Sequence, residues 1–171
     1  MLGAECTGKT QLCAALGVGL SALVVPEFLR SWCDEKQRAP EQREQALIIE
    51  GQLDAERAAC EDAWRAGVNW VVVDSSPLMT AIYSLEYFDD ETPCAQALAH
   101  QQRYSLSLVA DAAIPWLAEG WQRDSAQRRA SAQSRLLQIL KAGGLPFDVI
   151  AGEPARRLQL ATQIVNALPA A

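Results

Sequence analysis

Eight residues near the start of the chain, GAECTGKT from Gly3 to Thr10, match the pattern G-x-x-x-x-G-K-[ST]. The glycines allow a compact loop whose backbone N–H groups point inward, and a following helix adds partial positive charge at its N-terminus. In such a loop Lys9 reaches the β- and γ-phosphates of a nucleotide, and the Thr10 hydroxyl binds Mg²⁺. The alternative is a chance pair of glycines on a turn, but the apolar helical segment LCAALGVGL that follows favours a phosphate-binding loop.

The residues predicted to contact the polyphosphate are those of the loop and the residue after it. They are Gly3, Ala4, Glu5, Cys6, Thr7, Gly8, Lys9, Thr10 and Gln11. Because Cys6 lies inside the loop, we expect alkylation of its thiol to block nucleotide binding.

An aspartate, Asp74, ends the apolar run VVVD. A carboxylate at the tip of a buried strand beside a phosphate loop holds Mg²⁺, usually through water. The alternative role is helix capping, because Asp74, Ser75 and Ser76 precede a helix that begins with Pro77. The two roles are compatible.

The elements that must position these residues follow from apolar patterning. Strands are predicted at residues 21–28, 69–76, 106–113 and 147–152, and helices at 9–17, 46–67, 77–88, 127–142 and 154–168. Near-continuous apolar strands that alternate with helices indicate a parallel sheet covered on both faces, with right-handed crossovers. The sequence therefore predicts a single α/β domain over residues 1–171.

The sequence also predicts the burial of particular side chains in the helical segments. Leu47, Ile48, Leu53 and Trp64 lie on one broad apolar stripe of helix 46–67, which predicts that they are buried. His100 stands alone among polar residues, which predicts a polar surface residue.

Only Met1 and Leu2 precede Gly3, although a phosphate loop normally follows a central strand. A sheet without that strand leaves two ladders of backbone groups open. We therefore expect a truncated or missing first strand, with several further apolar residues upstream in the natural product. The alternative is a degenerate, poorly stable paralogue.

Bulk composition argues against several classes of protein. A net charge of -6 disfavours a chain-wide nucleic-acid surface, although QRDSAQRRASAQSR allows a local basic patch. No apolar run approaches the ~18 residues that a bilayer requires, and no signal-peptide pattern is visible. Five scattered cysteines without a CxxC pair fit a reduced cytoplasmic protein better than a disulfide framework or a zinc site.

Six stretches together carry a family resemblance. They are GAECTGKTQL, VVPEFLRSW, EGQLDAE, VVVDSSPLMTAIYSLEYF, ADAAIPWLAEGWQRD and VIAGEPARRL. In this order they resemble NadR-type nicotinamide riboside kinase domains, which are P-loop kinases with an AAA-type domain. The resemblance implies a three-layer fold with a parallel sheet of strand order 2-3-1-4-5, in which the four predicted strands are strands two to five. The chain has no room for the DNA-binding or adenylyltransferase parts of trifunctional members, so we expect neither repression nor dinucleotide synthesis.

The resemblance also implies an acceptor site at the end of VVPEF. Glu27 would orient or deprotonate the acceptor hydroxyl, with Arg30 one turn later. The alternative is an exposed Glu27–Arg30 ion pair of little energetic value. Asp111 and Trp116 are further candidates for acceptor binding, because an indole stacks on a flat base or pyridinium ring. Packing is the commoner role of tryptophan.

A mobile lid is implied at approximately residues 117–135. Arg123 and then Arg128 would close over the transferred phosphate, with Arg129 as a further candidate, because guanidinium groups suit phosphate oxygens. The alternative is a solvated helix face. This chain reads EGWQR where several relatives have a DGLR-like pattern, so the register of the key arginine is open by one position.

The loop after the last predicted strand is implied to contact adenine, through Gly152, Glu153 and Arg156. Helix capping is the alternative role of these residues.

These features predict a kinase that uses ATP and Mg²⁺ and transfers the γ-phosphate to a hydroxyl of a small metabolite, with nicotinamide riboside as the first candidate. The predicted catalytic residues are Lys9, Glu27, Asp74, Arg123 and Arg128, and the predicted metal ligands are Thr10 and Asp74. The alternatives are a regulatory ATPase or GTPase switch, weakened by the lack of a TKxD-like guanine signature, and a non-catalytic paralogue. The expected partners are ATP and the acceptor, without nucleic acid or membrane, and the oligomeric state is left open.

Overall fold

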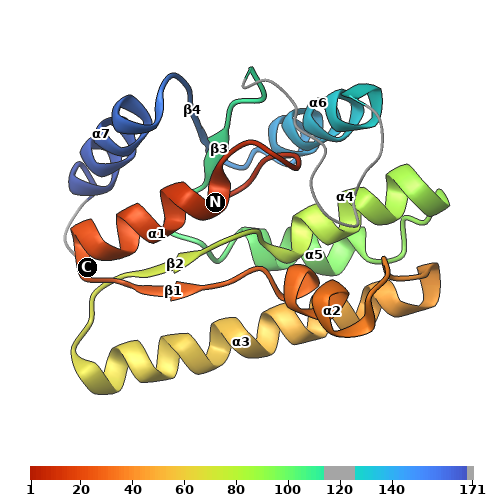
Figure 1. The fold of residues 1–171 in the computed structure, drawn as a ribbon, viewed down its shortest axis with the longest axis horizontal. Coiled ribbons are helices and arrows are strands. Elements are labelled where there is room, and N and C mark those ends of the chain that lie inside the picture. The colour runs from red at the N-terminus through yellow and green to blue at the C-terminus, as the bar shows by residue number, and fades with distance from the viewer. Residues whose placement is uncertain (114–125, 169–171) are drawn as a thin grey trace.

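The computed structural model describes residues 1–113 and 126–168, and shows four short strands in two parallel pairs (Figure 1). β1 (Leu23–Val25) pairs with β2 (Val71–Val73), and β3 (Leu108–Ala110) pairs with β4 (Asp148–Ile150). Each strand lies inside one of the four predicted apolar runs, so these predictions are confirmed. The strands are three residues long because the ends of the runs belong to loops and, at Phe28, to the following helix.

The first two residues lie between the two strand pairs and bond to both. Leu2 forms a parallel bridge with Val109 of β3. The bonds run from the Met1 amine to Val73 O (2.8 Å), Ser75 N to Met1 O (3.2 Å), Leu2 N to Leu108 O (2.7 Å) and Ala110 N to Leu2 O (2.8 Å). The first strand is thus a two-residue stub, as predicted. One continuous sheet of order 2-3-1-4-5 stays a prediction, because the strand pairs form two separate two-stranded sheets.

Seven α-helices and one short 3₁₀-helix (Gln42–Glu44) occur among the described residues. The α-helices are α1 (Lys9–Leu20), α2 (Phe28–Lys36), α3 (Gln45–Ala66), α4 (Pro77–Phe88), α5 (Cys94–Gln101), α6 (Ala126–Ala142) and α7 (Pro154–Asn166). The sequence predicted five of them and missed α2 and α5. Both missed helices are short, and α2 buries only Leu29, Trp32 and Cys33. No helix in the described ranges is long and apolar enough to cross a membrane.

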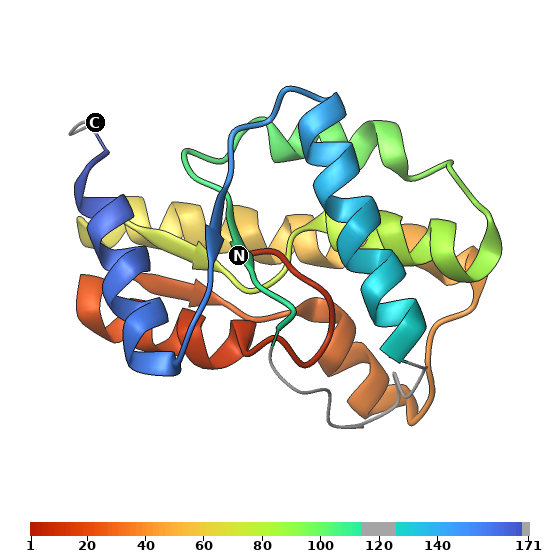
Figure 2. The same cartoon turned by 90° about the horizontal axis from the view of Figure 1, so that it is seen from above.

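The helices cover both faces of the strands (Figures 1 and 2). α1 packs against α7 on one face of the strands, whereas α3 runs along the opposite face of β1 and β2. One core cluster holds Leu2 and Val109 under α4 and α6, and a second holds Leu16 and Ile150 beneath α1 and α7. This three-layer arrangement confirms the predicted α/β fold class.

The predicted stripe on α3 is partly wrong. Trp64 is 84% exposed and Leu47 is 52% exposed, whereas Ile48 and Ile49 are buried. The face that α3 turns inward also carries the polar residues Gln52 and Glu56. The pattern of apolar residues did not predict this buried face, because its polar residues are hydrogen-bonded inside the protein.

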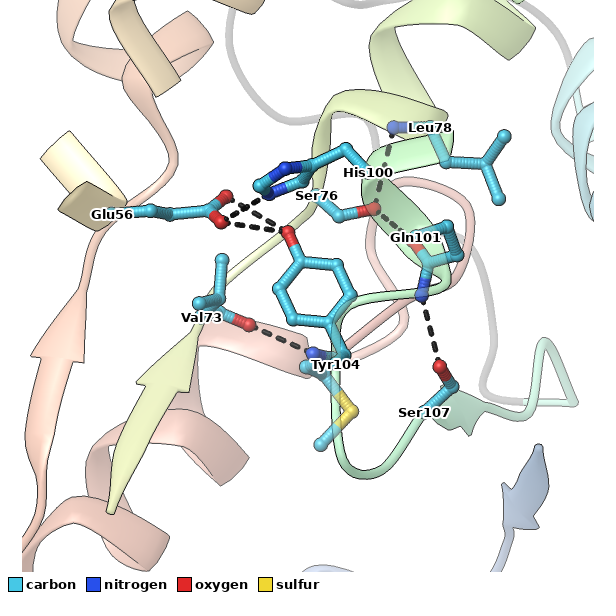
Figure 3. A network of polar contacts seen from close by, with 9 residues as sticks. Glu56, Val73, Ser76, Leu78, His100, Gln101, Tyr104 and Ser107 are labelled. Carbon is cyan, nitrogen blue, oxygen red and sulfur yellow. Dashed lines mark hydrogen bonds and ion pairs between the residues drawn. The ribbon is translucent and has the colours of Figure 1, made fainter. Parts of the chain in front are cut away.

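A polar network connects α3 with α5, and it corrects the prediction for His100 (Figure 3). Buried Glu56 accepts a hydrogen bond from the Tyr104 hydroxyl at 2.8 Å and contacts His100 Nε2 at 2.7 Å. The His100 side chain is only 15% exposed, so it is a packed bridge and not a polar surface residue. Nearby, Ser76 donates to Gln101, which donates to Ser107.

Substitution of Gly51 tests how closely α2 packs on α3. A Cβ at Gly51 would lie 2.3 Å from Phe28 Cε1, whereas a Cβ at Gly19 in α1 would meet nothing within 4 Å. We expect Gly51→Ala to destabilise the fold by ~1–3 kcal/mol through overpacking. Gly19→Ala should leave stability unchanged or raise it by up to ~1 kcal/mol. Denaturant unfolding of both variants measures this, and equal effects would contradict the packing described here.

Candidate functional site

The GAECTGKT segment forms a tight loop between the Met1–Leu2 stub and α1. Gly3, Cys6 and Gly8 have positive φ angles of 137°, 54° and 76°. A Cβ on Gly3 would lie 3.0 Å from the Ala110 carbonyl oxygen, so the close approach to β3 also requires glycine there. The backbone conformation therefore explains both glycines of the motif.

The carbonyl groups of residues 4–8 each accept a hydrogen bond, from donors in the loop itself and in three different helices. Ala4 O accepts from Lys9 Nζ and Thr7 Oγ1, both at 2.8 Å. The remaining donors are Arg129 Nε to Glu5 O (3.1 Å), Arg129 Nη2 to Cys6 O (3.4 Å), Arg157 Nη1 to Thr7 O (2.7 Å) and Leu12 N to Gly8 O (3.1 Å). Because the N–H of a trans peptide points opposite to its C=O, the amides from Cys6 to Lys9 point away from these donors.

The amides of the first turn of α1 have no partner within the helix and point out of its N-terminus, beside the loop. Gly8 is the N-cap of α1 and supplies no side-chain cap. The partial positive charge of this helix end favours an anion at the same place. The arrangement can hold a phosphate, with Lys9 beside it as a buried cation (8% exposed).

Two carboxylates lie near Lys9, each just beyond the carboxyl end of a strand. Asp74 is 2% exposed, and the Glu27 side chain is 13% exposed. Burial raises the pKa of Glu27 above its ordinary value of 4.5; Lys9 opposes this shift, and the charge of Asp74 adds to it. The site thus joins a lysine with a buried aspartate and a half-buried glutamate whose pKa is raised.

Asp74 fits a cation on its own geometry. Its Oδ1 atom is buried and has no hydrogen-bond partner, which is costly unless a positive group binds there. The described residues contain no cluster of three or more His, Cys, Asp or Glu side chains placed for a metal. Mg²⁺ in nucleotide sites needs only one or two protein ligands besides phosphate and water, so Asp74 and the exposed Thr10 suffice in number.

A contact between Tyr83 and Glu5 at the site was not revealed by the sequence. The Tyr83 hydroxyl on α4 donates to Glu5 Oε2 at 3.2 Å, and Glu5 Oε1 is buried without a partner. Burial first, and then the charge of Glu5, raises the pKa of Tyr83. Glu5 is therefore a third acid at the loop, held by a neutral phenol.

Of the predicted lid arginines, two lie on α6 and contact different partners. Arg128 donates to Glu86 O at 3.1 Å and stacks over the Tyr87 ring. Arg129 is buried and donates to the phosphate loop. Residues 126–135 of the predicted lid form the first part of α6, whereas Arg123 and Trp116 lie outside the described residues.

The remaining predicted residues are mostly exposed. Arg30 pairs with Glu27 at 3.7 Å, while Gln11, Glu153 and Arg156 face solvent. Gly152 has a positive φ of 99°. The Asp111 N–H donates to Ile150 O. Their predicted contacts with nucleotide or acceptor stay predictions.

Two buried polar residues at the loop were missed by sequence reasoning. Gln133 on α6 accepts from Ala4 N at 2.9 Å and donates to Ala110 O at 3.1 Å. Arg157 on α7 donates to Thr7 O. Both residues occupy helix positions that the spacing of apolar residues assigns to the core. A polar residue at such a position was the sequence signal that could have identified them.

A cavity of about 960 Å³ lies at the other edge of the strands and is separate from this site. Its lining includes Leu20, Trp70, Tyr104, Leu106 and Val165. None of the predicted site residues lines it. The candidate functional site is therefore the open carboxyl edge around the phosphate loop.

The chain matches the model of a family described as an AAA domain over residues 1–157. Among solved structures, a NadR protein in complex with NR has a TM-score of 0.79 at 22% identity, covering 96% of this chain and 49% of that chain. A NadR protein in complex with NAD and AMP-PNP has a TM-score of 0.73 at 20% identity, covering 96% and 47%. Deoxyadenosine kinase from M. mycoides, with products dCMP and a flexible dCDP bound, has a TM-score of 0.58 at 12% identity, covering 98% and 97%.

No curated protein matches the chain. The chain spans about half the length of the NadR chains that it resembles in structure. The family match runs over nearly the whole chain and contains the phosphate loop, the strand-end acids and the stretch between them. The chain therefore belongs to this AAA domain family, and it shares its fold with the two NadR structures.

Proposed function

We propose that this protein is an ATP-dependent kinase that transfers the γ-phosphate to a hydroxyl of a small metabolite, with nicotinamide riboside as the first candidate. The observation that carries the proposal is the placement of Lys9, which bonds to the phosphate loop and lies near two acids, buried Asp74 and half-buried Glu27. Phosphoryl transfer requires mainly positioning and neutralisation of charge, and these groups supply both.

The comparisons support a nucleotide and a small acceptor as ligands. The two NadR structures hold NR, or NAD with AMP-PNP, and the deoxyadenosine kinase holds dCMP and dCDP. All three chains share the fold with this protein at low sequence identity. The identity of the acceptor is therefore a proposal and is not transferred from these structures.

Each residue has a part in the proposed reaction. The loop amides bind the polyphosphate, and Lys9 leaves Ala4 O to neutralise charge on the β- and γ-phosphates. Glu27 accepts the proton of the acceptor hydroxyl. Bound Mg²⁺, held by Asp74 and Thr10, would supply further positive charge at the phosphates.

The other residues predicted from the sequence would contact the acceptor, the transferred phosphate or the adenine. Arg30, Asp111 and Trp116 would contact the acceptor, and Arg123 and Arg128 would close over the phosphate. The adenine would lie against the loop of Gly152, Glu153 and Arg156.

The function is tested by measuring ATP consumption with and without nicotinamide riboside in the presence of Mg²⁺. We expect stimulation by the acceptor and formation of a phosphorylated product. Lys9→Met and Asp74→Asn should each lower kcat/KM by at least ~100-fold, because each removes a group that stabilises transferring charge. Lys141→Met and Asp62→Asn, at exposed positions outside the site, are the matched controls.

Two other outcomes would reject the kinase. Hydrolysis of ATP that no acceptor stimulates would indicate a nucleotide-dependent switch. Absence of any thermal shift with Mg·ATP would indicate a non-catalytic protein.

The raised pKa of Glu27 predicts opposite effects of its substitution on activity and stability. As a base, Glu27 must be ionised, so kcat/KM should fall in acid with an apparent pKa above the ordinary glutamate value of 4.5. This acid limb of the pH profile should be absent in Glu27→Gln. Because the folded-state pKa is raised, ionisation destabilises the fold as pH rises through it. Glu27→Gln should therefore match or exceed the wild-type melting temperature at neutral pH, with the gain vanishing in acid. Glu50→Gln, on the exposed face of α3, should change neither profile.

Cys6 offers a chemical test of the phosphate loop. It is half-buried, as is Cys94, whereas Cys60 is exposed and Cys13 and Cys33 are buried. In a variant with serine at positions 60 and 94, alkylation with N-ethylmaleimide should abolish the ATP-induced thermal shift. A third substitution, Cys6→Ser, should restore the shift after the same treatment. Full ATP binding after stoichiometric labelling of Cys6 would refute its placement at the nucleotide.

A further inference from the structure

One arginine side chain, Arg157 on α7, bonds to three separate loops at the candidate site. It is 4% exposed. Its Nε donates to Gly152 O at 2.7 Å, its Nη1 to Thr7 O at 2.7 Å and its Nη2 to Asp111 O at 3.2 Å. These carbonyls belong to the phosphate loop, the loop after β3 and the loop after β4.

The partners of Arg157 are backbone carbonyls, and no described carboxylate forms an ion pair with it at 4.0 Å or less. A buried charge held by carbonyl dipoles without an ion-pair partner keeps part of its positive field, because the dipoles offset it less than a full negative charge would. The planar guanidinium also fixes the relative directions of the three carbonyls, which a flexible ammonium does not.

The bond to Thr7 O has a direct consequence for the phosphate loop. When this carbonyl is held toward α7, the N–H of the same trans peptide, which belongs to Gly8, points to the opposite side. Gly8 is also the N-cap of α1, so this N–H lies at the helix end whose partial positive charge favours an anion. The bond to Gly152 O fixes, through the same group, the loop proposed to lie against adenine.

We propose that Arg157 is a positioning residue for the nucleotide: it orients the Thr7–Gly8 peptide toward the polyphosphate and sets the spacing between the phosphate loop and the loop after β4. The inference rests on the proposed nucleotide site, and Arg157 acts through the two loops without touching the ligand. Its neighbour Arg156, chosen from the sequence, is exposed and contacts Gln159.

The test compares Arg157→Met and Arg157→Lys with the wild type in binding of ATP and of inorganic tripolyphosphate. We expect Arg157→Met to weaken ATP binding about tenfold or more, which corresponds to about 1.4 kcal/mol. Tripolyphosphate binding should weaken as well, because the Gly8 amide loses its orientation. Arg157→Lys should recover only part of the loss, since it keeps the charge but cannot bridge three carbonyls.

A kinetic readout separates positioning from mere stability. Loss of folded protein lowers kcat alone, whereas misplaced loops raise the KM for ATP. Arg65→Met, which removes the ion pairs of Arg65 with Glu61 and Asp62 on α3, is the control and should leave the KM for ATP unchanged. If Arg157→Met does not fold, the same comparison is made with Arg157→Lys.

The failure of this inference and the failure of the kinase are distinguishable. Folded variants that bind ATP and tripolyphosphate within twofold of the wild type would overturn the role of Arg157. Wild-type protein that binds ATP but phosphorylates no acceptor would reject the kinase and leave the binding comparison valid. Wild-type protein that binds neither ligand would overturn both.

Discussion

The candidate site depends on the direction of five consecutive carbonyl groups, from Ala4 to Gly8. A loop can present its amides to an anion only if its carbonyls bond elsewhere, because the two groups of a trans peptide point in opposite directions. Here the donors come from Lys9, Thr7 and Leu12 nearby, and from Arg129 and Arg157 far along the chain. The shape of the loop is thus maintained by α6 and α7 as much as by its own glycines.

The inner side of the phosphate loop presents positive groups, although the net charge of the whole chain is negative. The protein carries a net charge of -6, yet the inner side of the loop is lined by amides, a helix N-terminus and Lys9. Buried Asp74 and half-buried Glu27 lie near Lys9, and the pKa of Glu27 is raised above its ordinary value. Charged groups closer than a Debye length determine which ions bind at the site. The net charge of the whole chain has little effect there.

Much of the fold was predictable because its signals are local. Apolar runs marked all four strands, and α4 begins at the proline that the sequence indicated, with Ser76 as its cap. The errors have physical causes as well. α2 was missed because half of its residues are polar, and Trp64 was misassigned because the inward face of α3 satisfies buried polar groups such as Glu56.

The sequence by itself determined that Lys9, Glu27 and Asp74 would share one edge of the protein. Glycine spacing specifies the loop, and the carboxyl ends of parallel strands meet at the same edge whatever the details of packing. Only the tertiary structure decided that Arg157, and not its neighbour Arg156, supports the loop. Adjacent helical residues point about 100° apart, so the rotation of α7 against the core selects which of the two is buried. No local pattern contains that rotation.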